Sequence, residues 1–381
     1  MKLIRFTLIL AAFSLGTAAI HAADIVWTNT AGGNWNNATN WSPNTVPGAT
    51  DNAIITNSGT YTVTVNAAVA ITNLTLGGLS GTQTVANAAY TFTLNGYSSV
   101  GSNGVFAMDA GAVLSGAGDL GVLGRFNWTG GTLQGAGRLA ISNSATLAIA
   151  GFSYGKTLTR SLDLFGNGTV NGTTLAGGSG AFFNVYPSAV LDWQYDTAFS
   201  WTGGGGYATL SNAGLVKKSA GASVTSVNFI LNNTGIVRAQ SGDFSFGVGG
   251  LSSGNFDAVS NSAVTFGGGT HVMTNGVSFT ASSGGFHRCN GGTLAFETPY
   301  TFNPQFNLDI GGILAGSQNV NFTGLVNWLG GTMTGAGRTI ITNSATLNIS
   351  GFSYGKTLTR NLDLFGNGTV NGTTLAGGSG A

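Results

Sequence analysis

Apolar residues recur at every second position in short runs along this chain, and Gly or Asn residues bound each run. The clearest runs are YTVTV at 61–65, YTFTL at 90–94, SLDLF at 161–165 and DFSFGV at 243–248. A period of two is typical of β-strands, because successive side chains point to opposite faces. Asn-Gly turn signals stand at positions 95, 171 and 275. The pattern predicts short strands with turns about every six to ten residues.

The stretch SATLAIAG at 144–151 predicts which side chains face the core. Leu147 and Ile149 stand two positions apart, so both should point inward while the alternate alanines point outward. The equivalent stretch at 344–351 keeps both apolar residues and carries Asn348 and Ser350 at the alternate positions. An inward aliphatic pair with a permissive outward face would tolerate this change.

A long internal duplication runs through the chain. Residues 151–181, GFSYGKTLTRSLDLFGNGTVNGTTLAGGSGA, return at 351–381 with one change, Ser161 to Asn361. Upstream, NWTGGTLQGAGRLAISNSATLAIAG at 127–151 corresponds to NWLGGTMTGAGRTIITNSATLNISG at 327–351, and a fainter match reaches back to Asp109 and Asp309. Self-similarity at a fixed period is the sequence signature of repeat architectures. We expect the unit of 200 residues to be a run of many coils rather than one coil.

Composition supports β-structure and argues against helical surfaces. Charged residues make up 7% of the chain, Gly accounts for 64 of 381 residues, and the only Glu is Glu297. An average globular protein has roughly 25% charged residues and ~7% Gly. The chain also carries 23 Phe, 9 Tyr and 7 Trp, which argues against disorder because disordered segments are poor in aromatic residues.

Two all-β architectures fit the pattern: a chain of antiparallel sandwiches, or a solenoid of stacked coils. Sandwich domains should have longer strands and more surface charge. In a solenoid, Gly supplies the positive φ of tight corners, and Asn, Thr and Ser can form ladders between coils. The abundance of NGT, GGT and NSA therefore favours an all-β, right-handed parallel β-helix, a β-solenoid with short strands and Gly/Asn-rich turns. With roughly 20 to 25 residues and ~4.8 Å per coil, we expect on the order of 15 coils and a rod of roughly 70 Å.

The pattern of GGT-x-x-GAGR, NSATL-x-I and NGTV-NGT-x-L resembles the parallel β-helix stalks of bacterial surface proteins, such as autotransporter passengers and haemagglutinin-like adhesins. The segment VWTNTAGGNWNNATNWSPNTVPGATDNAIIT at 26–56 is similar to the opening of exported bacterial β-helix proteins, where a Trp-rich stretch and a VPG turn precede the first coils. The resemblance spans most of the chain. It rests on repeated sequence patterns rather than on a catalytic signature, so it implies the general style of these proteins and no particular activity.

The N-terminus, MKLIRFTLILAAFSLGTAAIHAADIVW, has two cations, an apolar run from Phe6 to Leu15 and then small residues ending at Ala22 or Ala23. This is the pattern of a secretory signal peptide. We expect cleavage near Ala22 or Ala23, no transmembrane segment in the mature chain, and a secreted or outer-cell-surface protein. Cys289 is the one cysteine, so no disulfide within the chain holds the fold.

Four segments are expected from these boundaries: the signal peptide at 1–23, an N-terminal Trp-rich cap with the first coils at 24–108, a first long repeat unit at 109–308, and a second, truncated unit at 309–381. The second copy stops at Ala381, whereas the first continues into FFNVYPSAVLDW. We therefore expect the sequence to be a fragment of a longer repeat protein.

The most site-like stretch is LDWQYDTAFSW at 191–201. If it is extended, Asp192 and Asp196 share one face and Trp193 and Tyr195 share the other, so these four residues are candidate glycan contacts. The alternative is that the aromatic residues fill or cap the solenoid and the aspartates are solvated. Most of the chain's 12 acidic residues are isolated, whereas a glycosidase needs a carboxylate pair and a Ca²⁺-assisted lyase needs several carboxylates around the metal.

Two other groups of residues suggest chemistry. In FHRCN at 286–290, His287 and Cys289 share a strand face, but a zinc site needs four ligands and a thiol nucleophile needs a positioned base. The repeated YGKTLTR contains Lys156 and Arg160, with copies at 356 and 360. These cations are either a paired basic site for acidic glycans or, as we expect, solubilising residues that face outward. We predict no catalytic residue, no cofactor and no metal site.

The sequence predicts an exported, non-enzymatic β-solenoid that acts as a cell-surface stalk or adhesin and contacts glycans or the surface of a host or neighbouring cell. The formal net charge of +1 and the absence of a basic patch argue against nucleic acid as a partner. Two alternatives stay open: a carbohydrate-active β-helix enzyme, such as a polysaccharide lyase or hydrolase, or a glycan-binding module; and a matrix protein that self-associates end to end.

Overall fold

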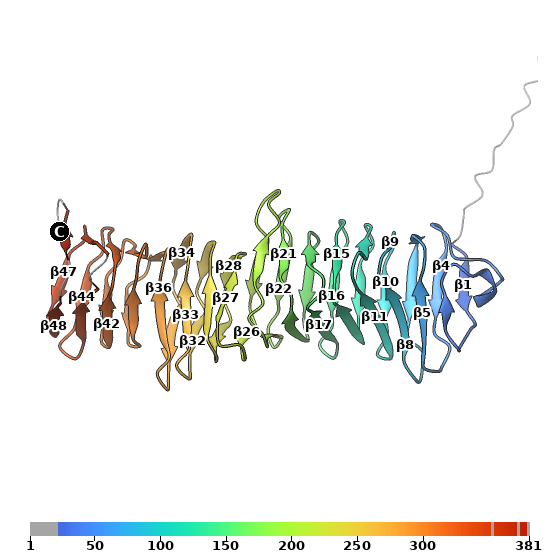
Figure 1. The fold of residues 1–381 in the computed structure, drawn as a ribbon, viewed down its shortest axis with the longest axis horizontal. Helices are drawn as coiled ribbons and strands as arrows, with labels where there is room; N and C mark the ends of the chain where they lie inside the picture. Colours follow the sequence, from blue (N-terminus) through green and yellow to red (C-terminus); the bar gives the residue numbers. More distant parts are fainter. Residues whose placement is uncertain (1–21, 352–353, 372–373, 379–381) are drawn as a thin grey trace, which may run out of the picture.

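The chain winds into a rod of stacked coils (Figure 1). The structure is a computed structural model that describes residues 22–351, 354–371 and 374–378, so nearly all of the predicted signal peptide lies outside the described residues. Parallel strands stack into a β-solenoid of about 15 turns, which confirms the predicted fold class. In the described part of the chain the only helix is one 3-10 turn, η1 (Ala38–Asn40), and no helix is long and apolar enough to cross a membrane.

After the N-terminal segment at 24–42, each complete coil contributes one strand to each of three faces, which we name A, B and C. Face A is one sheet of 18 strands: β1 (Asp24–Trp27), β3 (Trp41–Ser42), β4 (Asn52–Ile55), β7 (Asn73–Leu76), β10 (Ser98–Val100), β13 (Leu120–Val122), β16 (Leu139–Ile141), β19 (Leu162–Leu164), β22 (Phe182–Val185), β25 (Thr209–Asn212), β28 (Ile230–Asn233), β31 (Gly249–Ser252), β34 (Thr270–Met273), β37 (Thr293–Phe296), β40 (Ile313–Ala315), β43 (Gly331–Met333), β46 (Lys356–Leu358) and β49 (Leu375–Gly377).

Face B consists of a sheet of 12 strands followed by a sheet of 4. The first contains β2 (Gly33–Asn34), β5 (Tyr61–Val65), β8 (Gln83–Asn87), β11 (Gly104–Met108), β14 (Arg125–Trp128), β17 (Thr146–Gly151), β20 (Asn167–Gly172), β23 (Val190–Trp193), β26 (Leu215–Lys218), β29 (Ile236–Ala239), β32 (Asn255–Ala258) and β35 (Ser278–Ala281). The second contains β38 (Tyr300–Phe302), β41 (Val320–Phe322), β44 (Thr339–Ile341) and β47 (Leu362–Leu364).

Face C is one sheet of 15 strands: β6 (Val69–Ile71), β9 (Thr91–Leu94), β12 (Val113–Ser115), β15 (Gly131–Leu133), β18 (Lys156–Leu158), β21 (Leu175–Gly177), β24 (Phe199–Trp201), β27 (Val224–Val227), β30 (Asp243–Phe246), β33 (Ala263–Phe266), β36 (Phe286–Cys289), β39 (Phe306–Leu308), β42 (Leu325–Trp328), β45 (Thr346–Ile349) and β48 (Asn367–Val370).

Inward side chains of successive coils lie directly above one another and form the core. On face B, Val85, Phe106, Phe126 and Leu147 occupy one register position, and all are buried. Leu147 and its neighbour Ile149 are both buried, which confirms the inward pair predicted from the alternation. Burying such a side chain contributes roughly 1.5 to 3 kcal/mol, so the stacked core is the main source of stability.

Tryptophan residues close the N-terminal end of the rod. Trp27, Trp35 and Trp41 are buried, and the rings of Trp27 and Trp35 pack against Trp41 with centroids 4.9 and 4.8 Å away. β1 pairs in parallel with β4 and antiparallel with the short β3. An antiparallel strand with inward tryptophans thus covers the first coil.

The two copies of the duplicated block do not occupy the same faces. The strand at 125–128, β14, lies on face B, whereas its copy at 325–328, β42, lies on face C. The labels β14 and β42 differ by 28 strands, which is nine coils of three strands and one additional strand. The second copy is therefore turned by one face, or about a third of a turn, around the rod axis.

Face B is interrupted between β35 and β38, which belong to different sheets. Side chains take over hydrogen bonds of the strand edge there. The backbone N–H of Phe279 donates to the hydroxyl of Tyr300 at 2.8 Å, and the Nε2 of His287 lies 2.9 Å from the carbonyl oxygen of Thr280. The two neighbouring coils are still joined by strand ladders on faces A and C.

Candidate functional site

The candidate stretch at 191–201 forms a corner between faces B and C. β23 ends at Trp193 and β24 begins at Phe199, so residues 194–198 turn and are not extended. The predicted alternation therefore holds for Asp192 and Trp193 only. The directions of the Tyr195 and Asp196 side chains are set by the turn instead.

Trp193 points into the core. Its ring is fully buried against Phe199 and Phe244, with centroids 4.6 and 5.3 Å away, and its Nε1 donates to the carbonyl oxygen of Thr197 at 3.1 Å. The hydroxyl of Thr197 donates to the carbonyl oxygen of Gly172 in the preceding coil at 2.7 Å. Trp193 thus fills the solenoid and anchors the corner, as the alternative interpretation of the aromatics expected.

Asp192 belongs to an outward row of charges on face B. It aligns with Lys217, which aligns with Arg238, which aligns with Asp257. The Nζ of Lys217 lies 3.3 Å from the Asp192 carboxylate, and the Nε of Arg238 lies 2.7 Å from that of Asp257. Asp192 is itself mostly buried. This carboxylate is paired along the rod and is not simply solvated.

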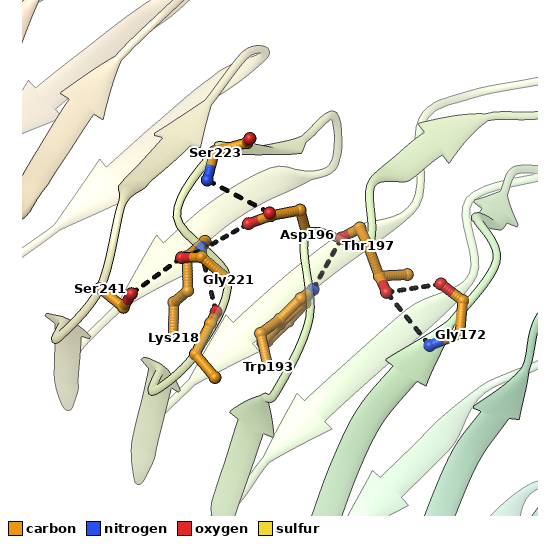
Figure 2. Close-up of polar contacts among 9 residues, drawn as sticks. Gly172, Trp193, Asp196, Thr197, Lys218, Gly221, Ser223 and Ser241 are labelled. Atoms are coloured by element: carbon orange, nitrogen blue, oxygen red, sulfur yellow. Dashed lines mark hydrogen bonds and ion pairs between the residues drawn. The ribbon is translucent and has the colours of Figure 1, made fainter.

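Asp196 neutralises a buried lysine (Figure 2). The side chain of Lys218 is fully buried, and its Nζ lies 2.7 Å from the Asp196 carboxylate. The Nζ also donates to the carbonyl oxygens of Ala220, at 2.9 Å, and of Gly221. The second carboxylate oxygen of Asp196 accepts from the backbone N–H of Ser223 at 3.2 Å. The pair ties the corner at 194–198 to the corner of the next coil.

Tyr195 is the one candidate whose ring reaches solvent. It is 48% exposed and packs edge-on against the exposed ring of Phe152, with centroids 5.1 Å apart. The four candidates therefore do not form one surface: Trp193 faces the core, Asp192 faces outward on face B, and Tyr195 and Asp196 lie at the corner. Contact between Tyr195 and a glycan stays a prediction.

His287 and Cys289 share a strand face as predicted, and both point into the core. Burial lowers the pKa of His287 to about 4 and raises the pKa of the Cys289 thiol to about 12. The Sγ of Cys289 lies 3.2 Å from the carbonyl oxygen of Gly292. A neutral thiol held inside the core does not provide the thiolate that nucleophilic or metal chemistry requires.

The cations of the repeated block are buried, so the prediction that they face outward was wrong. Lys156 and Arg160, and their copies Lys356 and Arg360, are at most 2% exposed. The Nε of Arg160 donates to the carbonyl oxygen of Gly137 at 2.7 Å, and its Nη2 donates to that of Gly118 at 3.0 Å.

The physical reason lies in the corners of the solenoid. Carbonyl groups of the Gly-rich corners turn inward away from water, and a buried carbonyl needs a donor. Arg160 satisfies carbonyls 23 and 42 residues earlier in the chain, in the two preceding coils. Burial lowers the pKa of Arg160 and of Arg360 to about 10, so both stay charged at neutral pH. Neither arginine is placed to bind an acidic glycan from solvent.

Each of the 12 carboxylates accepts at least one hydrogen bond or ion pair from the chain itself. Within residues 22–351, 354–371 and 374–378, no group of three or more His, Cys, Asp or Glu side chains could hold a metal ion. Carboxylates are used here to join neighbouring coils and to fix turns.

Two features were not predicted from the sequence. Lys218, the buried partner of Asp196, follows Lys217 in an ordinary strand pattern, and no local signal separates the outward lysine from the inward one. Trp201 and Tyr207 are 42% and 40% exposed and contact each other. The run of four glycines between them, at 203–206, is the signal that could have indicated a protruding loop.

The chain was compared with protein-family models, with curated proteins and with solved structures. None of the three comparisons finds a match.

Proposed function

We propose that the protein is an exported, non-enzymatic β-solenoid that acts as a cell-surface stalk or adhesin, in the style of autotransporter passengers and haemagglutinin-like adhesins. The observation that carries the proposal is the stack of about 15 parallel coils in which each coil forms the edge that the next one pairs with. Its carboxylates and buried cations hold neighbouring coils together. Because these polar groups serve to join coils, they support a structural role in which the protein acts through the length of its rod.

The experiment is to express the full chain in a bacterium with a general secretion pathway. The protein recovered outside the cytoplasm should begin near Ala23 or Asp24 when its N-terminus is sequenced. Small-angle X-ray scattering of that material should give an elongated particle of roughly 70 Å. A cytoplasmic, unprocessed chain would contradict export, and a compact particle would contradict the stalk.

A glycan-binding role is the second candidate, and the exposed pair of Tyr195 and Phe152 supports it. A glycan-array assay on the mature chain, with a polysaccharide-cleavage assay on the same preparation, separates the possibilities. Binding without cleavage supports an adhesin, and the absence of both binding and cleavage supports a scaffold. Release of products would instead support the carbohydrate-active enzyme, and filaments that grow with protein concentration would support a self-associating matrix protein.

A further inference from the structure

A second pair of exposed aromatic rings lies at a corner between faces C and A. β24 ends at Trp201, β25 begins at Thr209, and residues 202–208 between them read TGGGGYA. The ring centroids of Trp201 and Tyr207 lie 5.1 Å apart, with planes at 36°. In Figure 1 the light-green loop beside β21 and β22 projects beyond the neighbouring coils. We name Trp201, Tyr207 and the loop between them the ledge.

The ledge arises where the coil length changes abruptly. Phe199 aligns with Val227, 28 residues later, but Val227 aligns with Phe246 after only 19 residues. β24 and β27 pair at Phe199 and Val227 alone. Ser200 and Trp201 therefore have no ladder partner in the following coil, and a short strand edge is left beside the two rings.

The ledge is uncharged. Residues 197–216 contain no Asp, Glu, Lys, Arg or His. Just before them, Asp192 and Asp196 are neutralised by Lys217 and Lys218. A charged polymer would find no counter-charge at the ledge, so electrostatic complementarity favours a neutral partner.

The size of the ledge favours a sugar over a protein. A stable protein interface buries about 800 Å² on each partner, far more than two partly exposed rings can offer. A pyranose ring presents an apolar C–H face and a rim of hydroxyl groups. The C–H face matches an exposed aromatic ring, and the hydroxyls match the open strand edge, the Thr202 hydroxyl and the backbone amides of the glycine loop.

We propose that the ledge binds a segment of neutral polysaccharide, with Trp201 and Tyr207 as the residues on which sugar rings stack. This deepens the adhesin form of the proposed function and depends on neither export nor rod length. The site is distinct from the corner at 194–198, because it lies at the other end of β24.

The test is calorimetric titration of the full mature chain with neutral hexasaccharides, namely cellohexaose, xylohexaose and maltohexaose, and with hexagalacturonate as a charged comparison. The double variant Trp201→Ala/Tyr207→Ala should bind the preferred neutral sugar about tenfold or more weakly. The matched control is Tyr97→Ala, which removes a ring that is 67% exposed on an earlier coil and should leave affinity unchanged. Both variants should stay folded at the assay temperature, and the ledge variant should lose some thermal stability because its two rings are only partly exposed.

Tryptophan fluorescence gives an independent readout. The other six tryptophans, at positions 27, 35, 41, 128, 193 and 328, are buried, so quenching by acrylamide reports on Trp201. Bound neutral sugar should protect this fluorescence. No neutral sugar bound at millimolar concentration, equal affinity in the ledge and control variants, or tighter binding of the uronate would overturn the proposal. So would a wild-type dimer in sedimentation that the ledge variant abolishes, because the occupant would then be a second copy of the chain. A rod-shaped, exported protein with any of these results would still be a stalk.

Discussion

Single buried charges hold the corners of this solenoid. Lys218 and Arg160 are long side chains that enter the interior and donate to corner carbonyl groups that water does not reach. The two positive charges are compensated by different groups. Lys218 meets a carboxylate, that of Asp196, whereas Arg160 is held by backbone carbonyls of two other coils. Leaving a buried charge without its partner is costly, so stability should depend strongly on these residues.

Removing the carboxylate should cost more than removing the lysine. Asp196→Asn leaves the fully buried Nζ of Lys218 without a counter-charge, and we expect a loss of roughly 3 kcal/mol. Lys218→Met leaves Asp196, whose side chain is 23% exposed and keeps water, so the loss should be smaller. The double variant should be more stable than Asp196→Asn alone. Urea unfolding of all three variants measures the order, and equal losses in the two single variants would contradict it.

Two buried histidines should make the rod sensitive to acid. Burial lowers the pKa of His271 and of His287 to about 4, from an ordinary value of 6.5. Between these values the unfolded chain binds protons that the folded chain excludes, so stability falls as the pH drops from 6.5 to about 4. The loss should reach roughly 3 kcal/mol for each histidine.

The thermal midpoint measured from pH 7 down to pH 4 checks this dependence. His271→Gln/His287→Gln should start from a lower midpoint at pH 7, because the contacts of both rings with backbone carbonyl oxygens are disturbed, and should then lose much less on acidification. A double variant whose midpoint falls as steeply as that of the wild type would show that other groups cause the acid sensitivity.

Polar ladders join neighbouring strands at the scale of elements. On face C, Asn307, Asn327, Asn348 and Thr369 align in consecutive strands and form a chain of side-chain hydrogen bonds of 2.9, 3.2 and 2.8 Å. The ladders expected from the Asn and Thr content are therefore present. The first copy has Ala148 at the position of Asn348, between Asn127 and Thr169, so its ladder is broken.

The two copies provide matched reciprocal variants. Asn348→Ala should lower stability by roughly 1 kcal/mol, because it removes the link between Asn327 and Thr369. Ala148→Asn should raise stability by a similar or smaller amount by completing the same ladder on face B. Thermal midpoints of the two single variants check both signs. If Ala148→Asn lowers the midpoint, the outward position in the first copy does not accept the ladder geometry.

At the scale of the whole molecule, duplication lengthens the rod and also rotates the exposed residues of the second copy around the rod axis. A shift of nine coils and one strand moves each exposed position of the first copy to the adjacent face in the second. At ~4.8 Å per coil the axial shift is roughly 45 Å. A surface feature of the block is thus presented in two directions along one rod.

Spin labels at two equivalent exposed positions measure this arrangement. We choose Ser144→Cys and Ser344→Cys, because both serines are exposed and the native Cys289 is buried and should stay unlabelled. The axial rise and the turn together predict an electron–electron distance of roughly 45 to 50 Å with a narrow distribution. A much shorter distance or a broad distribution would show that the coils between the copies do not form one stiff stack.

The sequence by itself determined the local pattern. Alternation with a period of two and closely spaced Gly and Asn residues required short strands and tight corners, and small polar residues with little charge favoured stacked coils over sandwiches. The inward direction of Leu147 and Ile149 follows from the same pattern, because neighbouring positions of a strand face opposite ways. The duplication was also visible without the structure.

Only the tertiary structure decided where charged and aromatic side chains lie. Arg160 is buried because the carbonyls that it satisfies come from coils 23 and 42 residues earlier, a contact that no local pattern contains. Trp193 and Tyr195 separate because the strand ends between them, and Trp201 is exposed because the next coil is shorter. The turn between the copies likewise depends on the summed length of every coil between them. Coil lengths and corners are set by packing between distant residues, so the sequence predicts the rod but not its surface.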